Sequence, residues 1–220
     1  MNHYLIAALW GIVGAAGGIL VRWGSVKLAR LEELEPGNQA WQRFGPPILS
    51  AILFAIFASV ITSFPLLVVR SIFVLVLVQV IFFDFEHRLI LDRVIFPSMV
   101  LALLVTLSSL VWPQLGLWRQ PWWTGIALGL VAGLLFLLLG ILGTAVFKAE
   151  ALGFGDVKLA LFMGLLLGWP YTFTALFYGA FLAAFGVIVF VVRNRSLKGT
   201  LAYGPYLAGG ALILLLDPLK

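Results

Sequence analysis

Long apolar runs follow one another along this chain, and short segments that hold most of the charged residues separate them. A helix needs roughly 20 apolar residues to cross the hydrocarbon core of a bilayer. Inside lipid every backbone polar group must be satisfied within the protein, so such runs form helices. The sequence therefore predicts an all-α, multi-pass membrane bundle, a single domain over residues 1–220 with about eight transmembrane segments at 4–21, 47–62, 65–83, 94–112, 124–147, 157–167, 171–192 and 201–216.

Composition excludes several kinds of site. Hydrophobic residues form 63% of the chain and the mean hydropathy is +1.12, which is more apolar surface than a soluble domain of 220 residues can bury. The absence of cysteine rules out disulfides, a thiol nucleophile and thiolate metal ligands. Only two histidines are present, His3 and His87, so a histidine-rich metal centre is excluded within one chain. We expect chemistry that needs neither a metal nor another cofactor.

The placement of positive charge predicts the orientation. Eleven of the fourteen Lys and Arg lie on one side of the predicted bundle, Arg119 and Lys220 lie on the other, and Arg70 lies inside a run. The positive-inside rule makes the richer side cytoplasmic and places both termini outside. This pattern indicates membrane topology and no nucleic-acid partner. Arg70, near the outer end of its span, is expected to snorkel to the interface.

The first run is expected to be a permanent span. No Lys or Arg precedes it, and positive residues follow it at Arg22 and Lys27. A cleavable signal peptide has the opposite arrangement, with its positive charge ahead of the apolar stretch.

Two carboxylates at the predicted cytoplasmic boundary are the candidate catalytic residues. Asp84 follows the third run, and Asp156 precedes the short sixth run. If two carboxylates approach closely, repulsion and burial raise the pKa of one of them. The ionised carboxylate can then take a proton from water while the neutral one polarises an amide carbonyl. Hydrolysis by this route needs no serine, cysteine or metal.

Asp156 also has a purely structural interpretation. A short acid placed directly before a helix-forming segment is a typical N-cap, because it accepts backbone N–H groups at the positive helix end. Gly153 and Gly155 are more than a cap requires. Glycines permit positive φ and let another backbone approach closely, as a site that grips an extended peptide would need.

The other acids have alternatives too. Asp84 could be a boundary residue hydrated at the membrane interface, since carboxylates inside the membrane are costly. Asp92 opens the fourth run and could cap it. Asp84, Glu86 and His87 could form a metal cluster, although their spacing matches no recurrent ligand pattern.

Three motifs resemble those of the prepilin peptidases, the membrane aspartic proteases of type IV pilin-like systems. Gly153-Phe154-Gly155-Asp156 is similar to their Gly-x-Gly-Asp signature. Asp84-Phe85-Glu86-His87, with Asp92 and Pro97 after it, resembles their Asp-x-(Asp/Glu)-His…Pro-Asp…Pro loop. Tyr203-Gly204-Pro205-Tyr206-Leu207 resembles their Phe-Gly-Pro-Tyr-Leu segment. The three motifs occur in the family's order over about residues 82–207.

The resemblance implies a site and a substrate. It makes Asp84 and Asp156 the catalytic pair. The partners it implies are the lipid bilayer and a pilin-like precursor, cut on the cytoplasmic face of the inner membrane between a basic leader and an apolar helix. The residues expected to support the site are Gly153, Gly155, Lys158, Asp92, Gly204 and Pro205.

The chain also departs from the family pattern. Leu91 stands where the family usually has proline before Asp92. Many bacterial members have a long cytoplasmic loop with paired CxxC motifs, whereas residues 22–46 here form a short segment without cysteine. The resemblance thus implies peptidase activity, with S-adenosylmethionine as a cofactor only if methylation of the mature pilin is retained.

Two other classes of protein fit the same acids. A small proton-coupled transporter uses membrane carboxylates as proton relays, although such acids usually lie in mid-span. A non-catalytic scaffold would use both acids only as helix caps.

Overall fold

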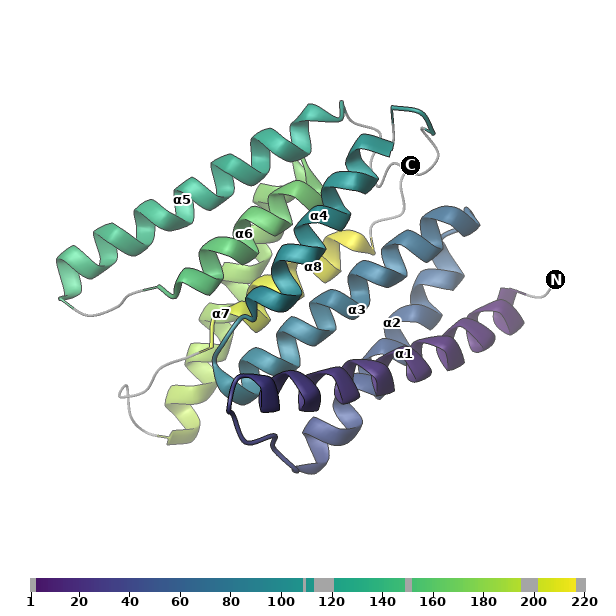
Figure 1. Cartoon of the computed structure of the whole chain (residues 1–220), viewed down its shortest axis with the longest axis horizontal. Coiled ribbons are helices and arrows are strands. Elements are labelled where there is room, and N and C mark those ends of the chain that lie inside the picture. The colour runs from purple at the N-terminus through teal and green to yellow at the C-terminus, as the bar shows by residue number, and fades with distance from the viewer. Residues whose placement is uncertain (1–2, 109, 113–120, 149–151, 195–201, 217–220) are drawn as a thin grey trace. The chain divides into compact units, whose positions relative to one another are not determined.

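The computed structural model describes residues 3–108, 110–112, 121–148, 152–194 and 202–216. Within this part of the chain all regular structure is helical, which confirms the all-α prediction (Figure 1). Arg119 and Lys220, which entered the topology prediction, lie outside the described residues. The helices are α1 His3–Leu31, α2 Ala40–Val60, α3 Phe64–His87, α4 Asp92–Ser108, α5 Trp123–Phe147, α6 Phe154–Leu167, α7 Tyr171–Asn194 and α8 Gly204–Leu215.

Five of these helices, α1, α2, α3, α5 and α7, are long and apolar enough to cross a membrane. This agrees with a multi-pass membrane protein. By contrast, α6 has 14 residues and α8 has 12, and both are apolar. The prediction that the sixth run is shorter than a full span is confirmed.

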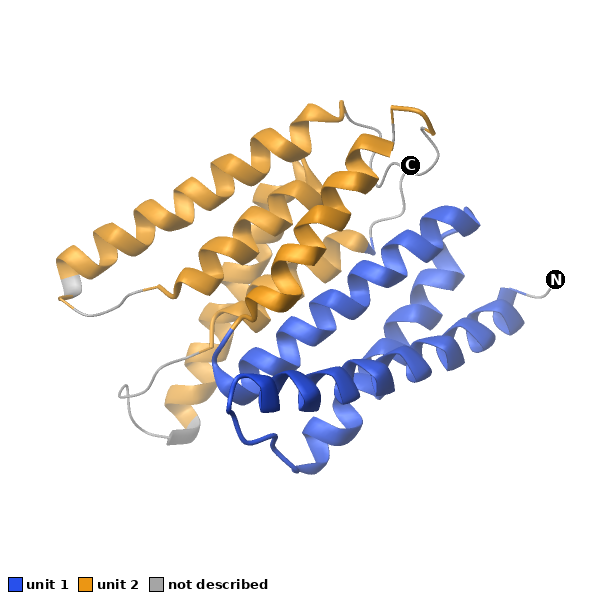
Figure 2. Ribbon diagram, in the orientation of Figure 1, with its two compact units in different colours: residues 1–89, 216–220 blue, residues 90–215 orange. Residues whose placement is uncertain are grey.

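The helices form two compact units, coloured separately in Figure 2. One contains α1, α2 and α3, and the other runs from Ile90 to Leu215 and contains α4 to α8. A single peptidase domain over residues 1–220 stays a prediction.

In the first unit, α1 and α2 pack closely because small residues line their contact. A Cβ on Gly14 would lie 2.5 Å from the Ser50 carbonyl oxygen, and a Cβ on Gly18 would lie 2.5 Å from the Pro46 carbonyl oxygen. Small residues at a helix interface let two backbones approach, which is the usual basis of helix association in membranes. In the same unit α3 packs on both α1 and α2.

Several helix boundaries differ from the predictions, and the largest difference is at α1, which continues ten residues past its apolar run to Leu31. The second helix begins at Ala40 and includes Pro46 and Pro47, whereas the apolar run begins at residue 47. The third helix continues past its apolar run to His87. In all three cases polar residues extend the helix beyond the stretch that hydropathy can detect.

The snorkelling prediction for Arg70 is wrong. Its side chain is fully buried in the first half of α3. The reason is that α3 is largely enclosed by protein, with Phe73, Val74 and Leu77 also fully buried on it.

In the second unit, α6 contacts each of α4, α5, α7 and α8. Its interior residues Leu159, Ala160, Phe162 and Met163 are fully buried. A Cβ on Gly164 would overlap the backbone of α5, so glycine is required there for these two helices to touch. The helix that begins with the Gly153–Asp156 motif is therefore held from several sides.

Candidate active site

Asp84 lies on α3, four residues before the Arg88 that ends the helix. The Asp84 carbonyl accepts the Arg88 N–H at 2.8 Å, and Arg88 adopts the left-handed conformation with φ of 54°. Asp84 is 5% exposed. A residue this buried does not fit the alternative of a carboxylate hydrated at the membrane boundary.

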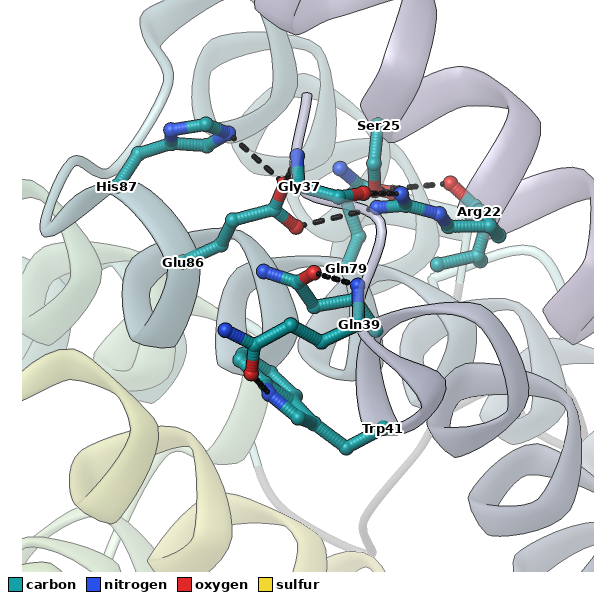
Figure 3. A network of polar contacts seen from close by, with 10 residues as sticks. Arg22, Ser25, Gly37, Gln39, Trp41, Gln79, Glu86 and His87 are labelled. Carbon is teal, nitrogen blue, oxygen red and sulfur yellow. Dashed lines mark hydrogen bonds and ion pairs between the residues drawn. The ribbon is translucent and has the colours of Figure 1, made fainter. Parts of the chain in front are cut away.

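Glu86, two residues further along α3, is the centre of a polar network (Figure 3). Its Oε2 pairs with Arg22 Nη1 of α1 at 3.1 Å. Its Oε1 accepts the backbone N–H of Gly37 and lies 3.3 Å from His87 Nε2. The second guanidinium nitrogen of Arg22 donates to the Gly37 carbonyl. Arg22, Gly37 and Glu86 thus close a ring of contacts between α1, α3 and the segment that joins α1 to α2.

The contacts of Glu86 and His87 bear on the alternative that Asp84, Glu86 and His87 bind a metal ion. His87 lies beside Glu86, and its ring also packs on Phe83 with the ring centroids 4.6 Å apart. Among the described residues, no group of three or more His, Asp or Glu side chains has an arrangement that could hold a metal ion. The cluster of Asp84, Glu86 and His87 is therefore not supported as a metal site.

Asp156 lies in the first turn of α6 and is not its N-cap. The cap is Gly153, and Asp156 is the third helical residue, with its own N–H donating to the Gly153 carbonyl at 3.0 Å. The N-cap interpretation is wrong because the helix begins three residues earlier than the sequence suggested. A carboxylate in the first turn is still favoured by the positive end of the helix.

The two glycines of this motif serve close packing. Gly153 has φ of −69°, and among the described glycines only Gly168 has positive φ, so neither glycine of the motif uses the positive φ that glycine permits. A Cβ on Gly153 would lie 3.4 Å from Asp156 Oδ2. A Cβ on Gly155 would lie 3.0 Å from the Cβ of Ile90, which is tighter than ordinary contact. Gly155 thus lets the start of α6 approach the residues just before α4.

Asp92 and Lys158 connect the starts of α4 and α6. Lys158 Nζ lies 2.5 Å from Asp92 Oδ1 and also lies over the rings of Phe154 at 4.9 Å and Phe96 at 5.3 Å. Asp92 is the first residue of α4, and its carboxylate pairs with Lys158. The lysine side chain is largely covered, at 19% exposed, while the aspartate is 54% exposed.

Tyr203, Gly204 and Pro205 lie at the start of α8 in the same unit as Asp156. Burial raises the pKa of the Tyr203 phenol, and the nearby Asp156 carboxylate raises it further. Gly204 and Pro205 are buried. The phenol of Tyr203 therefore interacts electrostatically with the Asp156 carboxylate.

Tyr203 also borders an apolar groove of about 420 Å³. Its ring packs on that of Phe136 with the centroids 6.3 Å apart. The other lining residues are Leu139, Leu142, Gly143, Val146 and Leu152. An apolar surface thus lies next to Tyr203, the residue whose phenol interacts electrostatically with Asp156.

The long apolar helices define a multi-pass membrane protein. The model of the type IV leader peptidase family matches residues 71–189, more than half of the chain, and the chain belongs to that family. The matched range includes Asp84, Asp92, Asp156 and Lys158, whereas Tyr203 lies beyond it. A search of curated proteins and a search of solved structures each found no match.

Sequence reasoning missed Arg22 and Gly37 as partners of Glu86. The signal available was that Arg22 ends one apolar run and Glu86 follows another on the same predicted side. Opposite charges at one depth could have been paired, but nothing local in the sequence selects these two, which are 64 residues apart.

Proposed function

We propose that this type IV leader peptidase is a membrane aspartic endopeptidase. It removes the basic leader of pilin-like precursors at the cytoplasmic face of the inner membrane. The observation that carries the proposal is the family match over residues 71–189, because that range contains both candidate acids. Asp84 and Asp156 are the residues that activate water.

In the proposed reaction the two carboxylates share one proton. The ionised carboxylate takes a proton from water while the hydroxyl oxygen attacks the scissile carbonyl carbon. The protonated carboxylate donates a hydrogen bond to the carbonyl oxygen. When the C–N bond breaks, the leaving amine takes a proton from the acid pair, and the products are the free leader and the mature N-terminus. Since the two acids titrate together, their apparent pKa values belong to the pair.

The surroundings of the two acids agree with a pair in which one carboxylate is ionised and the other is protonated. Asp84 is buried in a long helix, and Asp156 is only half-buried at the positive end of a short one. An ionised carboxylate is stabilised at such a helix end. Lys158 and Asp92 hold the start of α6, whose first turn contains Asp156, to the start of α4.

The experiment is a cleavage assay with purified protein and a pilin-like precursor. Wild-type protein is expected to yield a shortened product, and Asp84→Asn or Asp156→Asn is expected to lower the rate by several orders of magnitude. Glu35→Gln, which removes the charge of an exposed acid between α1 and α2, is the matched control. Cleavage that survives in both Asn variants would refute the proposal. A proton-coupled transporter would give no shortened product at all.

A further inference from the structure

The network around Glu86 lies at the end of the helix that carries Asp84, and the proposed chemistry does not use it. We call Arg22, Gly37 and Glu86, with the contacts among them, the brace. We call residues 32–39, which join α1 to α2, the strap. The brace fastens the strap and α1 to the last turn of α3 (Figure 3).

The last turn of a helix is its weakest part. The final four carbonyls have no partner within the helix, and helix ends fray. Asp84 lies in this region, because its carbonyl accepts the N–H of Arg88, the residue that ends α3. The position of the Asp84 carboxylate thus depends on whether this turn stays formed.

Glu86 acts on this turn from the side away from Asp84. Two residues on a helix are about 200° apart around its axis, so their side chains do not face each other. The brace therefore holds the backbone of the turn, and Glu86 is a positioning residue. The carboxylate is well suited to this, since both of its oxygens are used and it is only 5% exposed.

A second contact ties the same two helices through buried side chains. Ser25 donates to Gln79 Oε1 at 3.1 Å, and both side chains are buried. Ser25 is three residues after Arg22, and Gln79 is seven before Glu86, so each pair lies on one helix face. The two ties keep α1 in register along α3, and the brace is the one that also holds the strap.

We infer that the brace positions Asp84 for catalysis: Arg22 and Glu86 clamp the strap over the last turn of α3 and fix the catalytic carboxylate through the backbone of that turn. This inference rests on the proposed function. The strap thus contributes to the site through Gly37, although it lies outside the residues that match the family.

The first test is a double-mutant cycle in the cleavage assay. Arg22→Gln and Glu86→Gln are each expected to lower kcat about 100-fold, because a small displacement of a catalytic group has effects of this size. KM should stay within about threefold, since neither residue binds substrate. The double variant should be no worse than the poorer single variant, because both residues belong to one ring of contacts. Glu35→Gln, an acid of the strap with the same loss of charge, should retain wild-type kcat.

The second test measures how fast an added protease cuts the strap, so part of its result does not depend on peptidase activity. A glutamate-specific protease can cut the strap at Glu33 and Glu35, which are exposed. A Cβ on Gly37 would collide with the side-chain amide of Gln42, whose oxygen accepts the Gln39 N–H at 2.7 Å. Gly37→Ala should therefore speed cutting and lower kcat more mildly than Glu86→Gln. Gly24→Ala, where nothing lies within 4 Å of the new methyl, is the control and should change neither.

The outcomes separate the two proposals. Faster cutting of the strap together with unchanged kcat in Glu86→Gln would overturn the brace as a positioning device. Losses from Arg22→Gln and Glu86→Gln that multiply in the double variant would do the same. Cleavage of precursor by Asp84→Asn would instead overturn the proposed function, whatever the strap does.

Discussion

In the first compact unit, Asp84 lies near the end of a 24-residue helix, buried, with an ion pair fastening the turn that holds it. In the second, Asp156 lies in the first turn of a 14-residue helix, half-buried, behind a glycine cap that has no side chain. One acid is thus held by polar contacts from distant parts of the chain. The helix that carries the other is held by close packing at Gly155 and by the contact between Lys158 and Asp92.

The difference predicts which kind of substitution should disturb the surroundings of each acid most. Removing a charge should disturb the first unit, because its site depends on an ion pair that is mostly buried. Adding a methyl group beside Asp156 should disturb the setting of that acid, because Gly155 already lies against Ile90.

The largest effect tests whether the two acids act together despite their different settings. Asp84→Asn combined with Asp156→Asn is expected to lower kcat/KM no further than the poorer single variant, because residues of one catalytic unit are strongly non-additive. Single-turnover cleavage of a pilin-like precursor measures the rates. Losses that multiply would show that the acids contribute independently.

The next effect tests close packing in the second unit. Gly155→Ala places a methyl 3.0 Å from the Ile90 Cβ, and overpacking of this kind costs about 1–3 kcal/mol of stability. Gly140→Ala in α5 is the matched control, since its methyl would have its nearest neighbour at 3.7 Å. The control should gain roughly 0.5–1 kcal/mol, because alanine is the better helix former. Thermal unfolding in detergent compares the two, and an equally stable Gly155→Ala protein would contradict the packing argument.

A smaller effect concerns the charged contact of the second unit. Asp92→Asn removes a partly exposed ion pair and should cost about 0.5 kcal/mol. Lys158→Gln also removes the contacts with Phe154 and Phe96, so it should cost about 1 kcal/mol. Unfolding of the two variants under the same conditions gives the comparison. Equal costs would mean that the aromatic contacts of Lys158 contribute nothing measurable.

The smallest effect concerns the start of the strap. The N–H groups of Leu34 and Glu33 donate to the carbonyls of Ala29 and Arg30, which forms a Schellman motif with Glu33 at φ of 58°. Glycine avoids the left-handed cost of about 1 kcal/mol at this position but loses more conformational entropy on folding, so Glu33→Gly should gain about 0.5 kcal/mol. The unfolding temperature measures the change. A lower temperature would show that the glutamate side chain stabilises the turn by more than this.

Much of the fold follows from hydropathy, and the failures occur where polar residues belong to helices. The eight apolar runs each became a helix because lipid leaves the backbone no other way to satisfy its polar groups. The first helix was missed over its last ten residues, the second over its first seven and the third over its last four, since hydropathy does not detect polar turns.

The site was predicted less completely than the fold. Motif and boundary position selected Asp84 and Asp156, and their catalytic role stays a prediction. The sequence placed Asp156 at the cap, because an acid after glycine looks like a cap and the helix start at Phe154 leaves no polar signal. Arg22 and Glu86 were not paired, since a contact across 64 residues depends on how two helices pack.

The shortness of α6 has a consequence for the depth at which it can lie. Fourteen residues rise only about 21 Å along a helix, whereas the hydrocarbon core is about 30 Å thick. Because α6 is buried against α4, α5, α7 and α8, protein surrounds it where lipid would otherwise do so. The helix that carries Asp156 can therefore begin below the membrane surface, since backbone that is not helical is tolerated at that depth where protein encloses it.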